Sequence, residues 1–312
     1  MTSPSILFLC ERWKLAALPL VALARAGANI LGVWGRDISS SAPVFMPAGM
    51  HGMLRQATHM RILPDDRGVL LDAVHVSGLA SLAQELDIPC KLIPTLSSMA
   101  VPVAAKSLAP DLIVTVGTET PPTNALRDIP RLGWLNLHLS ALPDFAGADP
   151  TFWELRRGRS VSGVCVHTVG QELWNGNSIA IETLTFKNAR AWEERIALKL
   201  ERGATLLANT AMNFAPSTGT AITPSTINPP PSGADWNLTP DMTCAAIESF
   251  VGGFGAAGRV GLILDGQRLA IDGLTQSNPN ERSGKPGDRA RAEQGRIRYR
   301  CADGWVTLTT LP

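Results

Sequence analysis

The feature that most constrains the fold is an alternation of short apolar runs with helical patterns over the first two thirds of the chain. The runs are continuously apolar, which is typical of parallel strands buried on both faces of a sheet. We expect strands at residues 6–10, 30–34, 112–116, 134–139 and 163–169, and helices at 18–26, 81–86 and 192–214. The alternation predicts an α/β domain with an open, mostly parallel sheet, which binds ligands at the carboxyl ends of its strands.

The composition and the pattern of expected elements change after residue 214. Residues 215–235 are rich in Pro, Ser and Thr and predict a semi-extended linker. We expect one helix over 236–254, followed by short strands at 260–264, 268–271, 296–301 and 306–310, with a hairpin turn at Asp303-Gly304. The sequence thus predicts an α/β domain over 1–214, a linker over 215–235 and a smaller, mainly-β barrel domain over 236–312.

Composition excludes several classes of protein. The formal net charge is +1, which gives no general attraction for nucleic acids or anionic membranes. The five cysteines are scattered without CxxC spacing, so we expect reduced thiols in a cytoplasmic protein and no disulfide framework or metal site. Charged residues interrupt the apolar run at 6–10 at once, which favours a buried strand over a signal peptide, and no other stretch approaches the length of a membrane span.

The turn after the first predicted strand argues against a nucleotide enzyme of the usual kind. It consists of Glu11-Arg12-Trp13-Lys14, without the glycines that cradle phosphates in dinucleotide-binding and P-loop motifs. We therefore expect neither NAD nor ATP as the ligand.

Asn136 and His138 stand at the end of a predicted strand and share one face, because side chains two apart on a strand point the same way. The asparagine amide can donate to an oxygen that gains negative charge, and the imidazole can donate to it or transfer a proton. The alternative is a structural histidine bound to a backbone carbonyl. Taken alone, the pair favours the structural histidine.

The residues around this pair resemble the signature of the folate-dependent formyltransferases. The resemblance is carried by Leu132-Gly133-Trp134-Leu135-Asn136-Leu137-His138-Leu139-Ser140-Ala141-Leu142-Pro143, Gly147-Ala148-Asp149-Pro150 and Gly163-Val164-Cys165-Val166-His167. Residues 111–117 are similar to the strand that precedes the family's folate loop. Asp235-Trp236, Pro286-Gly287 and Cys301-Ala302-Asp303-Gly304 resemble the C-terminal β-barrel domain of the methionyl-tRNA formyltransferases, whose layout is the most similar.

The resemblance implies an activity and a set of site residues. A substrate amine would attack the formyl carbon of 10-formyltetrahydrofolate, and Asn136 and His138 would hold the resulting oxyanion. The residues implied to border the folate, mostly through backbone groups, are Gly117, Thr118, Glu119, Leu126, Leu139, Ser140 and Leu142.

Trp174 departs from the family pattern. Alignment without gaps from His167 to Gly176 places this tryptophan where the family has an aspartate that orients the histidine and keeps it protonated. An indole offers one N–H and no charge, so we expect a less well oriented and more often neutral His138. Candidate replacements are Glu119, Asp144, Asp149 and Glu172, each of which could equally be a solvated surface carboxylate.

Three functions stay open at this point. The first is transfer of a formyl group to the amine of a small molecule. The others are a binding or scaffold protein that has lost catalysis, and a hydrolase or acyl-transfer variant that uses no folate. A tRNA acceptor is disfavoured, because basic and acidic residues balance from Gly233 onward and the loop after Arg36 has no lysine or arginine before Arg55. The oligomeric state is left open.

Overall fold

The computed structural model of this chain describes residues 3–36, 44–46, 62–65, 68–71, 79–118, 120–186, 191–216, 218–292 and 295–311. Its contacts divide the chain into two units. The first consists of Met1–Ala146, Gly163–Thr183 and Ile196–Thr226, and the second of Gly147–Ser162, Leu184–Arg195 and Ile227–Pro312. The units interleave along the chain, whereas the bounds expected from the sequence are contiguous, and those bounds stay a prediction.

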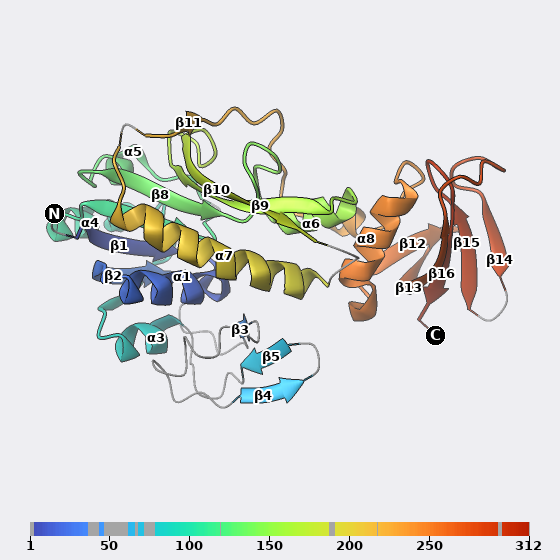
Figure 1. Cartoon of the computed structure of the whole chain (residues 1–312), viewed down its shortest axis with the longest axis horizontal. Helices are drawn as coiled ribbons and strands as arrows, with labels where there is room; N and C mark the ends of the chain where they lie inside the picture. The colour runs from blue at the N-terminus through green and yellow to red at the C-terminus, as the bar shows by residue number, and fades with distance from the viewer. Residues whose placement is uncertain are drawn as a thin grey trace. The chain divides into compact units, whose positions relative to one another are not determined.

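An eight-stranded sheet forms the centre of the first unit, with strand order β11-β10-β9-β8-β7-β1-β2-β6 (Figure 1). The strands are β1 (Ser5–Cys10), β2 (Asn29–Gly35), β6 (Cys90–Leu92), β7 (Leu112–Val116), β8 (Gly133–His138), β9 (Val161–Thr168), β10 (Asn177–Thr185) and β11 (Thr220–Ala221). The pairs from β6 to β8 are all parallel, whereas β8 pairs with β9 and β10 with β11 in antiparallel fashion. The predicted open, mostly parallel sheet is confirmed. A small antiparallel sheet contains β3 (Val44–Met46), β5 (Gly68–Leu71) and β4 (Ile62–Asp65).

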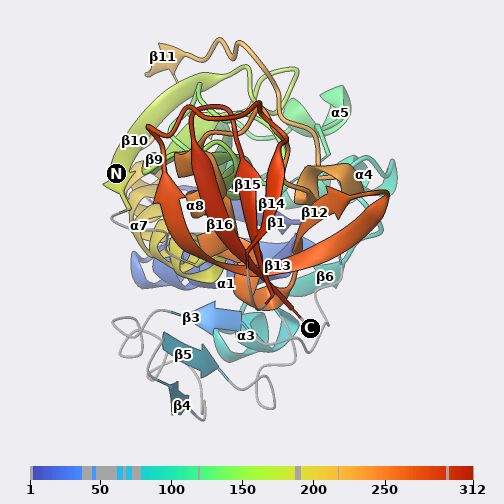
Figure 2. The same cartoon turned by 90° about the vertical axis from the view of Figure 1, so that its right-hand side faces the viewer.

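Helices cover both faces of the large sheet (Figures 1 and 2). On one face lie α1 (Trp13–Arg25) and α7 (Trp192–Met212), and on the other α4 (Ala100–Leu108) and α5 (Asn124–Arg127); α3 (Leu79–Glu85) contacts α1. Every residue of β7 is buried, as expected for a strand covered on both faces. In the part of the chain that the structure describes, no helix combines the length and the apolar character that a bilayer crossing requires.

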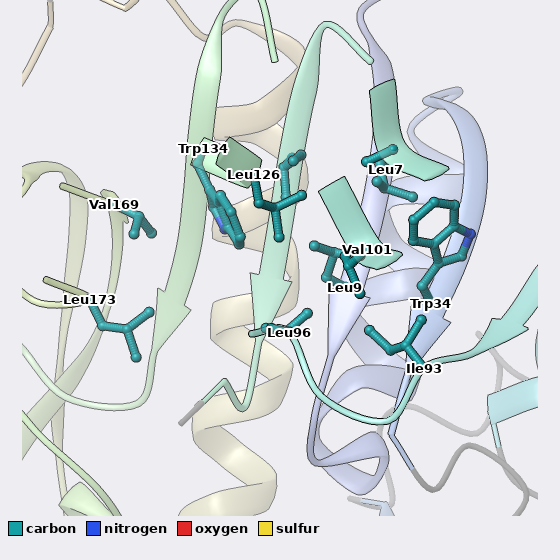
Figure 3. Packing of buried hydrophobic residues seen from close by; sticks show 12 residues of the cluster. Leu7, Leu9, Trp34, Ile93, Leu96, Val101, Leu126, Trp134, Val169 and Leu173 are labelled. Atoms are coloured by element: carbon teal, nitrogen blue, oxygen red, sulfur yellow. The ribbon is translucent and has the colours of Figure 1, made fainter. Parts of the chain in front are cut away.

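One buried apolar cluster links the strands to α4 and α5 (Figure 3). It includes Leu7 and Leu9 of β1, Leu126 of α5 and Trp134 of β8. On the α7 side, a Cβ added to Gly203 would come within 2.9 Å of the Leu137 side chain, so the glycine lets α7 approach β8 closely. Strand β8 is therefore held from both faces, which fixes the position of its carboxyl end.

The second unit contains α6 (Pro150–Arg156), η2 (Gly233–Trp236), α8 (Cys244–Phe254), η3 (Gly255–Ala257) and a five-stranded antiparallel sheet. Its strand order is β12-β13-β16-β15-β14, with bounds Val260–Leu264, Gln267–Asn278, Trp305–Thr310, Arg296–Arg300 and Arg289–Ala292. Phe152 of α6 packs against Trp236, Phe250 and Phe254, with ring centroids 4.8 to 5.6 Å apart. The predicted mainly-β character of this part is confirmed, and the sheet is an open half-barrel.

The helix expected over 236–254 is shorter than the sequence suggested. Pro240 disfavours helical backbone at Thr239, and α8 begins only at Cys244. There the Thr243 hydroxyl accepts a hydrogen bond from the Ala246 backbone N–H at 3.1 Å, which caps the helix. Apolar periodicity alone predicted a continuous helix, and the proline and the capping threonine set its true start.

Candidate active site

Asn136 and His138 lie on β8, between the parallel strand β7 and the antiparallel strand β9. The register places Thr115 of β7 and His167 of β9 on either side of Asn136, and Cys165 opposite His138. Asn136 is 4 % exposed and His138 6 % exposed. The structure thus brings the two predicted catalytic residues to the same buried strand end and adds partners from both neighbouring strands.

A directional chain of hydrogen bonds orients the Asn136 amide. The indole N–H of Trp134 donates to the Thr115 hydroxyl at 2.9 Å, and this hydroxyl donates to Asn136 Oδ1 at 2.9 Å. Asn136 Nδ2 in turn lies 3.0 Å from Nε2 of His167. An indole only donates, and the single hydrogen of the Thr115 hydroxyl has a shorter path to Asn136 Oδ1 than to the Leu135 carbonyl oxygen at 3.3 Å, which gives the chain its direction. The chain leaves Asn136 one amide hydrogen for a further acceptor.

His167 completes this chain as a neutral imidazole. Its Nδ1 lies 2.9 Å from the Thr168 carbonyl oxygen, which can only accept, so Nδ1 carries the hydrogen and Nε2 accepts from Asn136. Burial lowers the pKa of His167 to about 4. Sequence reasoning did not assign this residue a role, nor Thr115 or Trp134, because the contacts depend on strands far apart in the chain. The available signal was that all three residues fall within segments that resemble the family, Trp134 and His167 in its signature and Thr115 in residues 111–117.

His138 is also neutral, but it has fewer partners. Its Nε2 donates to the Phe145 carbonyl oxygen at 3.2 Å, so in the neutral ring Nδ1 carries a lone pair. Burial lowers the pKa of His138 to about 3, and electrostatic interactions with His167 and Lys199 disfavour a protonated ring further. The expected neutral state follows here mainly from burial, a cause that the sequence did not reveal. The ring can accept a proton at Nδ1 without first losing one.

Lys199 is a buried cation beside the strand end, and sequence reasoning missed it. It comes from α7 and donates from Nζ to the Leu139 carbonyl oxygen at 2.8 Å. This bond fixes the backbone immediately after His138. The lysine charge also disfavours a second positive charge on the imidazole.

Trp174 lies in apolar surroundings near this site. It is half-buried and packs against two buried clusters, one of which contains Leu142, Ala146 and Cys165. Cys165, a member of this cluster, pairs with His138 across β8 and β9, so the indole and the histidine share a neighbour. Among the described residues, the groups that shift the pKa of His138 include no carboxylate.

The candidate replacement acids receive no support from these contacts. Asp144 and Glu172 are exposed, and Asp149 precedes α6 in the second unit. Glu119 lies outside the described residues, as does the loop after Arg36. Within the described chain, the one group of side chains spaced for a metal ion is Cys244, Cys301 and Asp303, in the second unit.

Most of the predicted folate-bordering side chains are buried and already packed. Leu126 belongs to the core cluster with Trp134, Leu142 packs with Cys165, and Leu139 is buried. The Ser140 hydroxyl donates to the Asp144 carbonyl oxygen at 2.8 Å. These residues can therefore offer mainly backbone groups to a ligand, and their role stays a prediction.

Thr118 and Gly117 differ from the other predicted folate residues. The Thr118 hydroxyl is buried and has no hydrogen-bond partner in the described structure. Gly117 has φ +64°, which favours glycine, and a Cβ there would approach Arg12 Cβ to 3.0 Å. Glu11 holds the same loop, since its carboxylate accepts from the Thr120 N–H and hydroxyl, both at 2.9 Å. Residues just after β1 thus contact this segment on both sides of Thr118, whose hydroxyl oxygen has no hydrogen-bond partner among the described residues.

Comparison with known proteins identifies relatives of this chain. Residues 95–200 match the model of the formyl transferase family. A methionyl-tRNA formyltransferase from Acidobacterium capsulatum is 27% identical over 214 residues, which cover 66% of this chain and 67% of that protein. One from Pseudomonas fluorescens is 40% identical over 90 residues, covering 29% of this chain and 28% of that protein. The match to the second relative thus spans less than a third of its length.

Solved structures share the fold at low sequence identity. An N-formyltransferase from Helicobacter canadensis, in complex with folinic acid and dTDP-3-aminofucose, has a TM-score of 0.62 at 14% identity, over 97% of this chain and 98% of that one. HypX from Aquifex aeolicus, in complex with tetrahydrofolic acid, has a TM-score of 0.53 at 14% identity, over 98% of this chain and 44% of that one.

Proposed function

We propose, from the premise that this chain belongs to the folate-dependent formyltransferase family, that it transfers a formyl group from 10-formyltetrahydrofolate to the amine of a small molecule. The observation that carries the proposal is the state of the two residues at the end of β8. Asn136 is oriented with one amide hydrogen to spare, and His138 is neutral with a lone pair on Nδ1. An oxyanion donor and a base in this arrangement fit attack by an amine on a carbonyl carbon.

Asn136 and His138 have separate roles in the proposed reaction. Bound 10-formyltetrahydrofolate supplies an activated formyl carbon. Asn136 donates its remaining amide hydrogen to the formyl oxygen as the amine attacks and the oxygen becomes negative. His138 takes a proton from the attacking nitrogen on Nδ1, and then returns it to the folate nitrogen as the carbon–nitrogen bond breaks. In this scheme the histidine begins neutral, so it does not need the family's aspartate to keep it protonated.

The loop after β7 supports a folate donor. The unpartnered Thr118 hydroxyl is suited to hydrogen bonding with a polar ligand, because a buried polar atom without a partner is costly. The Glu11 carboxylate accepts two hydrogen bonds from Thr120, which hold this residue next to the end of β1. The Helicobacter canadensis structure, which contains folinic acid, has a similar fold over nearly the whole chain.

The charges of the second unit favour a small acceptor over a tRNA. Arg298 binds both carboxylate oxygens of Glu281 at 2.9 Å, and Arg289 pairs with Asp265. Arg300 is buried and donates to the carbonyl oxygens of Ser283 and Gly304. Arginines that are paired or buried in this way are poorly placed to bind phosphates. An amino sugar is the acceptor class we would test first, since the Helicobacter canadensis structure contains one.

A direct assay tests the proposal. The protein is incubated with 10-formyltetrahydrofolate and, in parallel, with nucleotide-linked amino sugars, free amino acids or methionyl-tRNA, while folate release and product mass are followed. We expect release of tetrahydrofolate and a formylated small amine. Failure to bind folate in calorimetry would exclude a folate donor, and formylation of methionyl-tRNA alone would exclude a small acceptor.

A binding protein that has lost catalysis is the second candidate, and Trp174 is the observation that favours it. The indole sits at the family's acid position and packs against apolar side chains, so the site has lost a charged group. This candidate predicts folate binding in calorimetry with no turnover for any amine. Measurable turnover that depends on His138 would contradict it.

A further inference from the structure

Cys244 and Cys301 are brought together in the second unit, although they lie 57 residues apart in the chain. Cys244 is the first residue of α8, and Cys301 directly follows β15. Their sulfur atoms are 3.1 Å apart, and both residues are buried. The scattered cysteine spacing gave no indication of this pair.

The surrounding backbone holds the two cysteines in place. The Cys301 N–H donates to the Gly304 carbonyl oxygen at 2.9 Å, which closes the turn between β15 and β16. The Ala302 N–H donates to the Met242 carbonyl oxygen at 2.8 Å, which ties this turn to the segment before α8. The Asp303 carboxylate accepts from the Cys244 N–H at 2.7 Å. The sulfur atoms therefore approach each other because three backbone contacts fix the turn against the helix start.

Asp303 also lies next to one of the sulfurs. Its Oδ1 is 3.6 Å from the Cys301 sulfur, and the residue is partly exposed, so it connects the buried pair to solvent. Burial, the Cys301 thiol and the Asp303 carboxylate together raise the pKa of Cys244 to about 12. The thiol form of Cys244 is thus favoured, and Cys301 is the cysteine whose sulfur lies beside the Asp303 carboxylate.

The geometry suits a disulfide better than a metal ion. Cys244, Cys301 and Asp303 supply three ligands, whereas structural zinc sites take four, and tetrahedral zinc with bonds of about 2.3 Å would separate two sulfurs by about 3.8 Å. The sulfurs are closer than that. A disulfide bond of about 2.05 Å requires the two side chains to approach by roughly 1 Å.

We propose that Cys244 and Cys301 are a modification site, at which hydrogen peroxide forms a reversible disulfide. Asp303 accepts the Cys301 proton, the Cys301 sulfur attacks one peroxide oxygen, and the oxygen–oxygen bond breaks. The departing hydroxide takes the proton from Asp303 and leaves as water. Cys244 then attacks the oxidised Cys301 sulfur, the sulfur–oxygen bond breaks, and the leaving hydroxide takes the Cys244 proton. Two thiols and one peroxide thus give one disulfide and two water molecules.

The full-length protein tests this proposal. Cleavage at Arg202, Arg259 and Arg300 places the cysteines on separate peptides, 203–259 and 301–312, neither of which holds another cysteine. After peroxide treatment we expect these peptides to be linked, with a mass two hydrogens below their sum, and two of the five thiols to be lost. Reduction by dithiothreitol should reverse both changes. Because the bond closes a long loop, the oxidised protein should melt several degrees higher.

Variants separate this pair from the other cysteines. Cys301→Ser should abolish the linked peptide and the shift in melting temperature, whereas Cys90→Ser, which removes an exposed thiol, should leave both unchanged. Persistence of all five thiols in the folded wild-type protein under excess peroxide would overturn the proposal, even if a variant fails to fold. Zinc in the isolated protein that shields these two thiols until a chelator removes it would also overturn it.

Discussion

The two residues at the end of β8 differ in how the fold supports them. Asn136 is held by a chain of hydrogen bonds that runs through Trp134, Thr115 and His167. His138 has one ring hydrogen bond within the described structure, to a backbone carbonyl, and an apolar cluster with Trp174 lies beside its partner strand. The comparison teaches that the proposed oxyanion donor is preorganised by hydrogen bonds, whereas the proposed proton-transfer group depends on burial for its protonation state.

Asn136→Ala should cause the largest loss of activity. Removal of one oxyanion donor costs about 10²- to 10³-fold in kcat, and we expect the upper end because the amide is fully oriented. Steady-state kinetics with 10-formyltetrahydrofolate measures the loss. Asn209→Ala, on the exposed face of α7, is the matched control and should be unchanged. A loss below tenfold for Asn136→Ala would show that the oriented amide does not serve the reaction.

His138→Ala should cost less, about 10²-fold in kcat, the lower part of the range for general acid–base catalysis. The wild-type rate should also lack an acid limb near pH 6.5, because a histidine with a pKa of about 3 stays neutral across that range. A pH–rate profile from pH 5 to 8 at saturating amine measures this. A wild-type limb near pH 6.5 that disappears in the variant would contradict a buried, neutral base.

The two buried histidines should make the protein less stable in mild acid. The pKa of His167 is lowered to about 4, below its unfolded value, so the unfolded chain binds more protons once the pH falls below about 6.5. Between pH 7.5 and 5.0 this histidine should cost about 2 kcal/mol of unfolding free energy. Urea titrations of wild type and His167→Gln at both pH values measure the difference. Equal acid sensitivity of the two proteins would refute the assignment.

Trp174→Asp should change the protonation of His138 and leave the orientation of the Asn136 amide unchanged. A carboxylate near the ring raises the pKa of His138 and should introduce an acid limb into the pH–rate profile, with a change in kcat of about tenfold. Trp174→Phe retains the apolar packing and serves as the control. Identical profiles for the two variants would place the tryptophan too far from the histidine to act on it.

Thr115→Val should have the smallest effect, because it removes one link of the chain and leaves Asn136 in place. We expect a loss of about three- to tenfold in kcat, from one misdirected hydrogen bond worth roughly 1 kcal/mol. Thr115→Ser keeps the hydroxyl and should restore the rate. If Thr115→Val and Thr115→Ser have the same activity, the hydroxyl does not orient the amide.

Apolar runs and turn residues in the sequence correctly predicted several helices and strands. The strands at 112–116 and 260–264 have the bounds that their apolar runs indicated, and the helix after β1 ends next to Gly27. Several elements were not expected, among them α4 and β10. Helix α4 contains Pro102 near its start, and the edge strand β10 is only partly buried, so neither shows a clean periodic pattern. The predicted start of α8 was wrong because the spacing of apolar residues carries no information about the capping residue, Thr243.

The sequence by itself determined the α/β order and the Asn136 and His138 pair, and it predicted a missing carboxylate at Trp174, because each of these depends on residues close together in the chain. Tertiary structure alone decided what surrounds them. Thr115, His167 and Lys199 come from β7, β9 and α7, and Cys244 meets Cys301 across 57 residues. Burial, which lowers the pKa of both histidines, likewise arises only when distant segments pack together.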